Sequence, residues 1–225
     1  MARDRAAKDR GVAAPVIDEL RLVDLTDHDG SPLEAHGFHE ALRFRDLDST
    51  GADLAGLVLS ECEVRGWRAH EAVLRGARLQ ETILERVDAP ALSAPRSTWR
   101  DVRVTGSRFG SAELYDADLA EVVVADSRLG WVNLRAARLG DVLVRDCTIE
   151  ELDLTGAALE RVRFEGTTVE TLTVTDARLQ DVDLRGLEVR RIDGLDGLRG
   201  ATVDDHQVTL LAPLLAAHLG LRIEQ

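Results

Sequence analysis

Large apolar side chains recur at every fifth position of the chain, from Phe44 to Val189. Of the 30 positions in this series, 26 hold a large apolar residue; the exceptions are Ser49, Ala69, Ala89 and Ala94. Two residues before each position stands a second uncharged residue, which is usually smaller, as at Ala52, Cys62, Ala117 and Ala157. None of these positions is charged, although charged residues make up 31% of the chain. The pattern predicts a structural unit of five residues.

A period of five fits neither a helix nor a continuing strand. On an α-helix with 3.6 residues per turn the apolar residues would spiral around every face, and on a strand they would alternate between faces. The pattern is satisfied when three residues run extended, with the outer two pointing inward, and the next two turn a corner. Glycine, which readily adopts the positive φ of tight turns, often fills the second corner position: Gly51, Gly56, Gly66, Gly76, Gly106, Gly156, Gly166 and Gly186.

A longer period of twenty residues sets the number of corners in each coil. The triplet Ala77-Arg78-Leu79 recurs in similar form at 117–119, 137–139, 157–159 and 177–179. Four pentads per repeat predict a four-sided coil in which like residues stack in columns. Thirty pentads then make about 7.5 coils, and a strand spacing of about 4.8 Å gives a rod roughly 36 Å long.

The triplets Ala52-Asp53-Leu54, Ala117-Asp118-Leu119 and Val132-Asn133-Leu134 resemble the repeats of pentapeptide repeat proteins. The resemblance covers about two-thirds of the chain, and residues 198–214 are similar to the tail of an actinobacterial, hence bacterial, subgroup. It implies an all-β solenoid, a right-handed quadrilateral parallel β-helix. The best understood relatives mimic DNA, bind bacterial DNA gyrase and protect it from inhibitors. The resemblance therefore names gyrase, or another DNA-binding protein, as a possible partner.

Side-chain volumes within the pentads indicate that both apolar positions point inward. Trp67 and Trp99 accompany the small residues Ala69 and Ser97, as expected when one close-packed slot must be filled. Pro90 and Pro95 fall at corners, where we expect a distorted coil or a small bulge. The two cysteines, Cys62 and Cys147, lie 4.25 coils apart, about 20 Å, which is too far for an intramolecular disulfide.

The chain divides into three segments. Residues 42–192 form the predicted β-helix. In the N-terminal segment, 1–41, residues 1–14 show no periodicity and are expected to be disordered, and 15–41 are expected to lead into and cover the first coil. Residues 193–225 are expected to form a helical cap that starts at Asp204 or Asp205, ends near Gly220 and is kinked or split at Pro213.

The cap carries more apolar side chains than one narrow coil requires. The sequence therefore favours a two-fold dimer through this segment, with Leu210, Leu221 and Ile223 adding apolar surface and the main contacts made by Leu211, Leu214, Leu215 and Leu219.

Net charge and motifs exclude several classes of function. A net charge of −13 argues against direct binding of nucleic acid. The charged start and the lack of a membrane span favour a cytoplasmic location without membrane association. His36 and His39 have a spacing that is generic for metal ligands and are read as solvated loop residues. With no catalytic or cofactor motif, we expect a non-enzymatic protein without metal or cofactor.

A column of carboxylates gives the most specific candidate site. One corner of successive coils is acidic, at Glu61, Glu81, Asp101, Glu121 and Asp141; Arg161 then interrupts the column, and Asp181 resumes it. Acids spaced by about 4.8 Å can imitate the phosphates of a duplex, which recur about every 3.4 Å along one strand. Neighbouring arginines could instead neutralise these acids in ordinary ion pairs.

A second surface favours another protein partner. Tyr115 and Trp131 are predicted at outward corners of one face, and Val123 and Leu143 point outward on another. The sequence thus leaves two readings open, a DNA mimic and a general protein-interaction module, alongside scattered surface apolarity without function.

Overall fold

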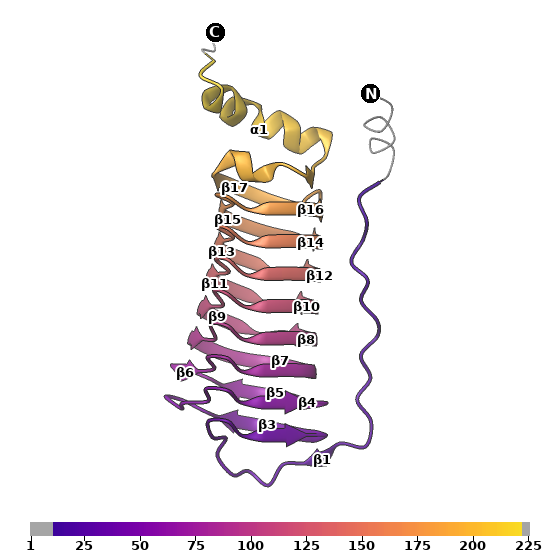
Figure 1. Ribbon diagram of the computed structural model, residues 1–225, viewed down its shortest axis with the longest axis vertical. Helices are drawn as coiled ribbons and strands as arrows, with labels where there is room; N and C mark the ends of the chain where they lie inside the picture. The colour runs from indigo at the N-terminus through magenta and orange to yellow at the C-terminus, as the bar shows by residue number, and fades with distance from the viewer. Residues whose placement is uncertain (1–10, 222–225) are drawn as a thin grey trace.

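The pentads wind into a parallel β-helix in which each strand pairs with strands one coil away (Figure 1). The structure is a computed structural model that describes residues 11–221. Leu119 pairs with Trp99 on one side and Leu139 on the other, a step of twenty residues. The same step holds from the pairing of Phe38 with Val58 to that of Val169 with Val189. The predicted parallel solenoid of twenty-residue coils is confirmed.

The N-terminal half of the solenoid contains β1 (Thr26–Asp27), β2 (Phe38–Glu40), β3 (Leu42–Asp48), β4 (Val58–Ser60), β5 (Glu63–Arg68), β6 (Ala72–Val73), β7 (Arg78–Ser93), β8 (Thr98–Thr105) and β9 (Arg108–Glu113). The second half contains β10 (Asp118–Ala125), β11 (Arg128–Asn133), β12 (Arg138–Arg145), β13 (Thr148–Asp153), β14 (Ala158–Glu165), β15 (Thr167–Thr173), β16 (Arg178–Asp183), β17 (Leu187–Asp193) and β18 (Ala201–Thr202). A short 3-10 helix, η1 (Leu195–Leu198), precedes β18, and α1 (Asp205–His218) follows it.

The solenoid has about nine turns, more than the 7.5 counted from the apolar pattern. The additional turns lie at its ends, where β1 and β2 precede residue 42 and η1 and β18 follow residue 192. An end coil packs against a neighbouring coil on one side only. The residues at its inward positions are therefore less constrained by packing, so the five-residue apolar pattern ends before the solenoid ends.

The core follows the predicted exchange of volumes. Trp67 and Trp99 are both buried, and each indole N–H donates to a serine hydroxyl, at 3.0 Å to Ser49 and at 2.9 Å to Ser97. These bonds satisfy the one polar group of each ring. The predicted leucine column also points inward, with Leu54, Leu74, Leu134 and Leu154 buried and Leu114 packed against the core.

The coil at the two prolines is regular, so the predicted distortion is wrong. Strand β7 is continuous through Pro90, and its register with the next coil keeps the twenty-residue step at Ala89 and Ala91. No residue is inserted. A corner tolerates proline because the ring holds φ near a value that suits a turn. Cys62 and Cys147 are buried free thiols, and burial raises the pKa of both.

More corner residues adopt the left-handed backbone conformation than the positions of the glycines predicted. Gly106 has φ of 58° as predicted, but Asp116 and Ala136 adopt the same region, with φ of 58° and 54°. Gly186 is an exception, because its φ is not left-handed. It is required for a different reason: a Cβ there would collide with the carbonyl oxygen of Phe164.

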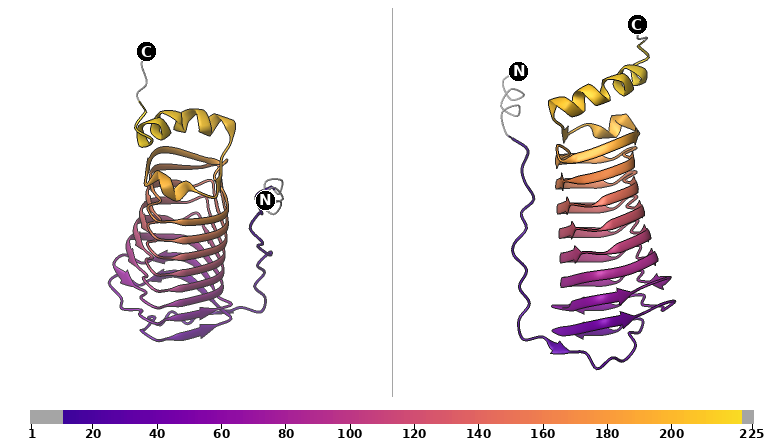
Figure 2. Two further views of the ribbon diagram at one scale, coloured as in Figure 1. Left: turned by 45° about the horizontal axis from the view of Figure 1, so that its top comes forward. Right: turned by 180° about the vertical axis from the view of Figure 1, so that it is seen from behind.

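The N-terminal segment runs along the side of the rod before it enters the first coil (Figures 1 and 2). Only residues 26–41 cover that coil: β1 pairs with β3, Leu33 is buried, and the His28 ring lies 4.4 Å from that of Phe44. Residues 15–25 precede this cover and run beside the rod, where they lead into the first coil (Figure 1). Residues 11–14 are extended beside the rod rather than disordered, and residues 1–10 lie outside the described part of the chain.

The C-terminal helix closes the last coil with its first turn. Asp204 caps α1 in a capping box with Gln207, and the Gln207 amide also donates to the carbonyl oxygens of Leu184 (2.6 Å) and Leu187 (2.8 Å). The helix continues through Pro213, so it is not split there. Within residues 11–221, no helix has the length and apolarity needed to cross a membrane.

Candidate interaction surface

The five predicted acids lie on one corner of successive coils. Glu61, Glu81, Asp101, Glu121 and Asp141 all adopt the left-handed backbone, with φ between 46° and 59°. The flanking strand residues are in register from coil to coil, as in the pairing of Val102 with Val122 and of Val122 with Val142. Arg161 holds the same corner position, with φ of 52°, and Asp181 follows it. We call the five acids with Asp181 the acidic column.

Two of the five acids are held in ion pairs. Asp141 accepts two hydrogen bonds from the Arg161 guanidinium, both at 2.7 Å. Arg161, assisted by the backbone N–H of Val16, lowers the pKa of the Asp141 carboxyl. Asp101 lies 2.7 Å from the Arg103 guanidinium. Arg161 belongs to the next coil and Arg103 to the same coil, so arginines of the rod itself neutralise these two carboxylates.

The three glutamates differ from them. Among residues 11–221, Glu61, Glu81 and Glu121 form no ion pair, and Glu81 only accepts a 3.3 Å hydrogen bond from the Gln80 amide. The backbone does not explain them either, since the left-handed region favours Asn, Asp and Gly rather than Glu. Neither local conformation nor ion pairing accounts for glutamate at these positions.

Residues 11–25, which we call the strap, lie along the acidic column. The Ala13 N–H donates to Asp181 Oδ1 (3.2 Å), and the Val16 N–H donates to Asp141 Oδ1 (2.9 Å). Further along, Arg103 Nη2 donates to the Asp18 carbonyl oxygen at 2.6 Å. The sequence did not predict this contact. Its signal is a run of apolar residues spaced alternately by three and two, all half-buried in the structure: Val12, Pro15, Ile17, Leu20, Leu22 and Leu25.

The outward strand positions beside the column are unusually apolar. Ile83, Val123 and Leu143 point outward yet are only partly exposed, and Arg103 stands among them with 14% of its side chain exposed. Arg103 also donates to the Glu121 carbonyl oxygen at 2.9 Å. Val123 and Leu143, which were predicted to point outward, therefore lie next to the acidic column and beside the strap.

The two candidate aromatics lie elsewhere. Trp131 is at the opposite corner of the four-sided coil, where it pairs in register with Ser111 and Glu151. Tyr115 is at the corner that precedes the column's corner in each coil, and both rings are half-buried. The column and Trp131 therefore belong to separate surfaces.

The four C-terminal leucines are divided between capping and exposure. Leu211 packs against the core, whereas Leu214, Leu215 and Leu219 are exposed, the last with 72% of its surface. A cleft of about 690 Å³ separates part of α1 from the last coil and is lined by apolar residues that include Leu187, Ile192, Leu198 and Leu210. Ile223 lies outside the described residues.

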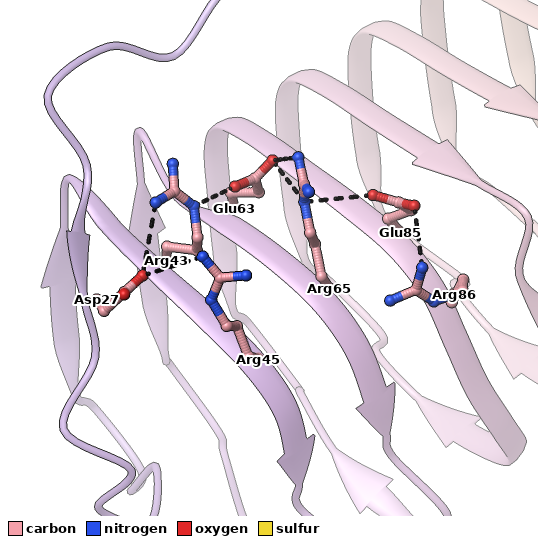
Figure 3. Close-up of polar contacts among 7 residues, drawn as sticks. All are labelled: Asp27, Arg43, Arg45, Glu63, Arg65, Glu85 and Arg86. Carbon is pink, nitrogen blue, oxygen red and sulfur yellow. Dashed lines mark hydrogen bonds and ion pairs between the residues drawn. The ribbon is translucent and has the colours of Figure 1, made fainter.

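An ion-pair ladder on the first coils was missed by sequence reasoning. Glu63 is buried between Arg43 and Arg65, each with a nitrogen 2.6 Å from the carboxylate, and these arginines lower the pKa of Glu63 against the effect of burial (Figure 3). Asp27 of β1 lies 3.5 Å from Arg43 and 3.6 Å from Arg45. The ladder therefore ties the base of the strap to the rod.

The histidines form no metal centre within the described residues. His39 lies edge-on to Phe44 and near His28, while His36 is exposed. Burial lowers the pKa of His39. Across residues 11–221, no group of three potential ligands converges.

Part of the rod matches a known family of repeats. Residues 127–166 match the family model described as pentapeptide repeats, in eight copies. The chain matches no curated protein sequence. A trypsin-treated form of QnrB1, described as a plasmid-mediated fluoroquinolone resistance protein, is similar at 21% identity over 88% of this chain and 95% of that one, with a TM-score of 0.48.

HetL, described as a pentapeptide repeat protein involved in heterocyst differentiation regulation in the cyanobacterium Nostoc sp. strain PCC 7120, is similar at 20% identity. That match covers 76% of this chain and 91% of HetL, with a TM-score of 0.33. The eight matched repeats lie inside a solenoid that keeps the same twenty-residue step from β2 to β17, and the chain therefore has the pentapeptide repeat fold.

Proposed function

We propose that the chain is a non-enzymatic protein-interaction module whose partner surface is the acidic column. The observation that carries this proposal is the set Glu61, Glu81 and Glu121, which has neither an ion-pair partner among residues 11–221 nor a backbone reason to be acidic. Surface carboxylates held in a fixed row by rigid coils present an ordered negative charge. Their partner is a protein with a basic groove.

The specific form of this proposal is a DNA mimic. The acids repeat with the strand spacing of about 4.8 Å, comparable with the phosphate spacing of about 3.4 Å along one DNA strand. The net charge of −13 suits a partner that binds DNA. The family resemblance makes bacterial DNA gyrase the first candidate, which the chain would modulate or shield from inhibitors in the cytoplasm.

Charge reversal on the column tests both forms. Glu81→Lys combined with Glu121→Lys is expected to abolish partner binding and leave the rod folded, because Arg161 shows that this corner accepts a long basic side chain. Binding by the wild type should weaken steeply as salt is raised, since charge steering dominates such contacts. Pull-down from native lysate, with thermal melting as the folding check, measures the result.

The matched control is Asp116→Lys with Asp176→Lys, which makes the same charge change at exposed left-handed positions of a different corner. Equal loss of binding in both double variants would show that net charge, not the column, matters. Trp131→Ala addresses the alternative surface. If it removes binding while the column variant does not, the partner sits at the opposite corner.

Supercoiling by purified gyrase separates mimicry from general interaction. A DNA mimic competes with duplex DNA and either inhibits supercoiling or protects gyrase from a fluoroquinolone. Absence of both effects at a large molar excess of this protein would eliminate gyrase as the partner and leave the interaction module with another protein.

We also propose a two-fold dimer through α1, with Leu214, Leu215 and Leu219 at its centre and Tyr115 and Trp131 outside it. Support comes from the exposed leucines and from the apolar cleft beneath the helix. An isologous contact would bury both. Leu215→Glu with Leu219→Glu is expected to convert a dimer to a monomer in light scattering, whereas Ala212→Glu should not. A wild type that is already monomeric at tens of micromolar would refute the dimer.

A further inference from the structure

We propose that the strap, residues 11–25, is a displaceable cover of the acidic column, which must swing away before a cationic partner can bind. The inference rests on the proposed function of the column and adds its regulation. It comes from the observation that the chain's own N-terminal segment already uses two carboxylates of that column as hydrogen-bond acceptors.

The spacing of the contacts made by the strap matches the spacing of the coils in the rod. Asp141 and Asp181 are two coils apart, about 9.6 Å at the strand spacing. The residues that contact them, Val16 and Ala13, are three apart, and three extended residues span about 10 Å. One extended chain can therefore meet these two carboxylates, which lie two coils apart. Arg103 holds the next section through the Asp18 carbonyl oxygen, 2.6 Å away.

The contacts of the strap are weak compared with those of the coil. Residues 11–25 contain no strand, and the bonds from Ala13 and Val16 go to side chains rather than to a neighbouring strand. Segments with few backbone bonds open locally at low free energy without unfolding the rest of the protein. Strand β1 and the Asp27 ion pairs fix the base of the strap, so it can swing out and return (Figure 3).

Charge favours replacement of the strap by a basic partner. The strap offers the column neutral N–H groups and itself carries Asp18, Glu19 and Asp24 against one arginine, Arg21. It therefore leaves the negative charge of Asp181 and of the three unpaired glutamates of the column unneutralised. A guanidinium or ammonium group makes charge-assisted hydrogen bonds to such carboxylates, which are roughly twice as strong as neutral ones. Strap and cationic partner thus compete, and each weakens the other.

A reversible lock tests the competition in the full chain. Ala13→Cys with Asp181→Cys introduces two thiols at neighbouring positions, since the Ala13 backbone nitrogen now lies 3.2 Å from Asp181 Oδ1, and the native cysteines are buried. The probe is a fluorescent nona-arginine peptide at low salt, and mass spectrometry confirms the disulfide. We expect the oxidised protein to bind about tenfold more weakly than the same protein after reduction.

A proline substitution tests the opposite direction. Val16→Pro removes the N–H that Asp141 accepts and leaves the rod unchanged, while Val16→Ala keeps that N–H and alters only an exposed side chain. We expect Val16→Pro to bind the probe several-fold more tightly and to exchange the amide hydrogens of residues 11–25 faster. Val16→Ala should match the wild type in both measurements.

The outcomes distinguish this inference from the proposed function. Equal probe binding by oxidised and reduced protein, with binding still abolished by Glu81→Lys and Glu121→Lys, overturns the cover and leaves the column as the partner surface. Unchanged probe binding by that charge-reversed variant overturns the column as a binding surface, and the cover falls with it.

Discussion

Leu134→Asp is expected to abolish cooperative folding of the β-helix. Leu134 is buried in the column of leucines from successive coils, which includes Leu114 and Leu154. A carboxylate there has no partner, and an unpaired charge in an apolar core costs more than about 5 kcal/mol, comparable with the total stability of many domains. Because each coil of a solenoid is stabilised by its neighbours, one disrupted coil separates the rod into two halves.

Urea and thermal unfolding followed by circular dichroism measure this effect. The control is Ala136→Asp, which introduces the same charge two residues away at an exposed corner with φ of 54°. Asp116 and Asp176 already occupy that corner of other coils, so the control should change stability by no more than about 0.5 kcal/mol. If Leu134→Asp unfolds at the wild-type midpoint, the inward leucine column is wrong.

Gly130→Ala is expected to have the second largest effect, a loss of about 1–3 kcal/mol typical of overpacking. Pro90, Gly110 and Gly130 occupy the same corner position of three successive coils, and a Cβ on Gly130 would overlap the carbonyl oxygen of Gly110. The φ of Gly130 is not left-handed. The cost is therefore steric and falls on backbone atoms that cannot move without breaking the register.

Gly140→Ala is the matched control. Gly140 also has no left-handed φ, but an added Cβ there meets nothing within 4 Å. We expect its midpoint to stay at the wild-type value or rise slightly, since alanine restricts the unfolded chain more than glycine does. Equal destabilisation by the two substitutions would show that the close approach of the coils at Gly130 is not what requires glycine.

The candidate site was predictable only in part from the sequence. The position of each acid follows from the twenty-residue period, which by itself assigns Glu81 and Glu121 to one corner. Whether a given acid is paired depends on side-chain reach across coils, which the period does not encode. Asp141 is bound by Arg161 of the next coil, whereas Glu121 forms no ion pair among residues 11–221, although the coils beside each of these acids contain arginines.

The ion-pair ladder shows the same limit. Glu63 looks like any other surface acid in the sequence, yet it is buried because Arg43 of the adjacent strand and Arg65 of its own strand close over it. The contact between Glu63 and Arg43 joins residues twenty positions apart, whose side chains meet only after the coils have stacked.

The sequence by itself determined the solenoid of this protein: a corner every five residues, a coil every twenty residues and the filling of its core around Trp67 and Trp99. A solenoid is built from contacts between neighbouring turns, so a local period carries nearly all the information. Only the tertiary structure decided what lies on the outside of the coil. The strap meets Asp141 and Asp181 through contacts that span 125 and 168 residues, and the apolar spacing of the strap does not specify which coils it meets.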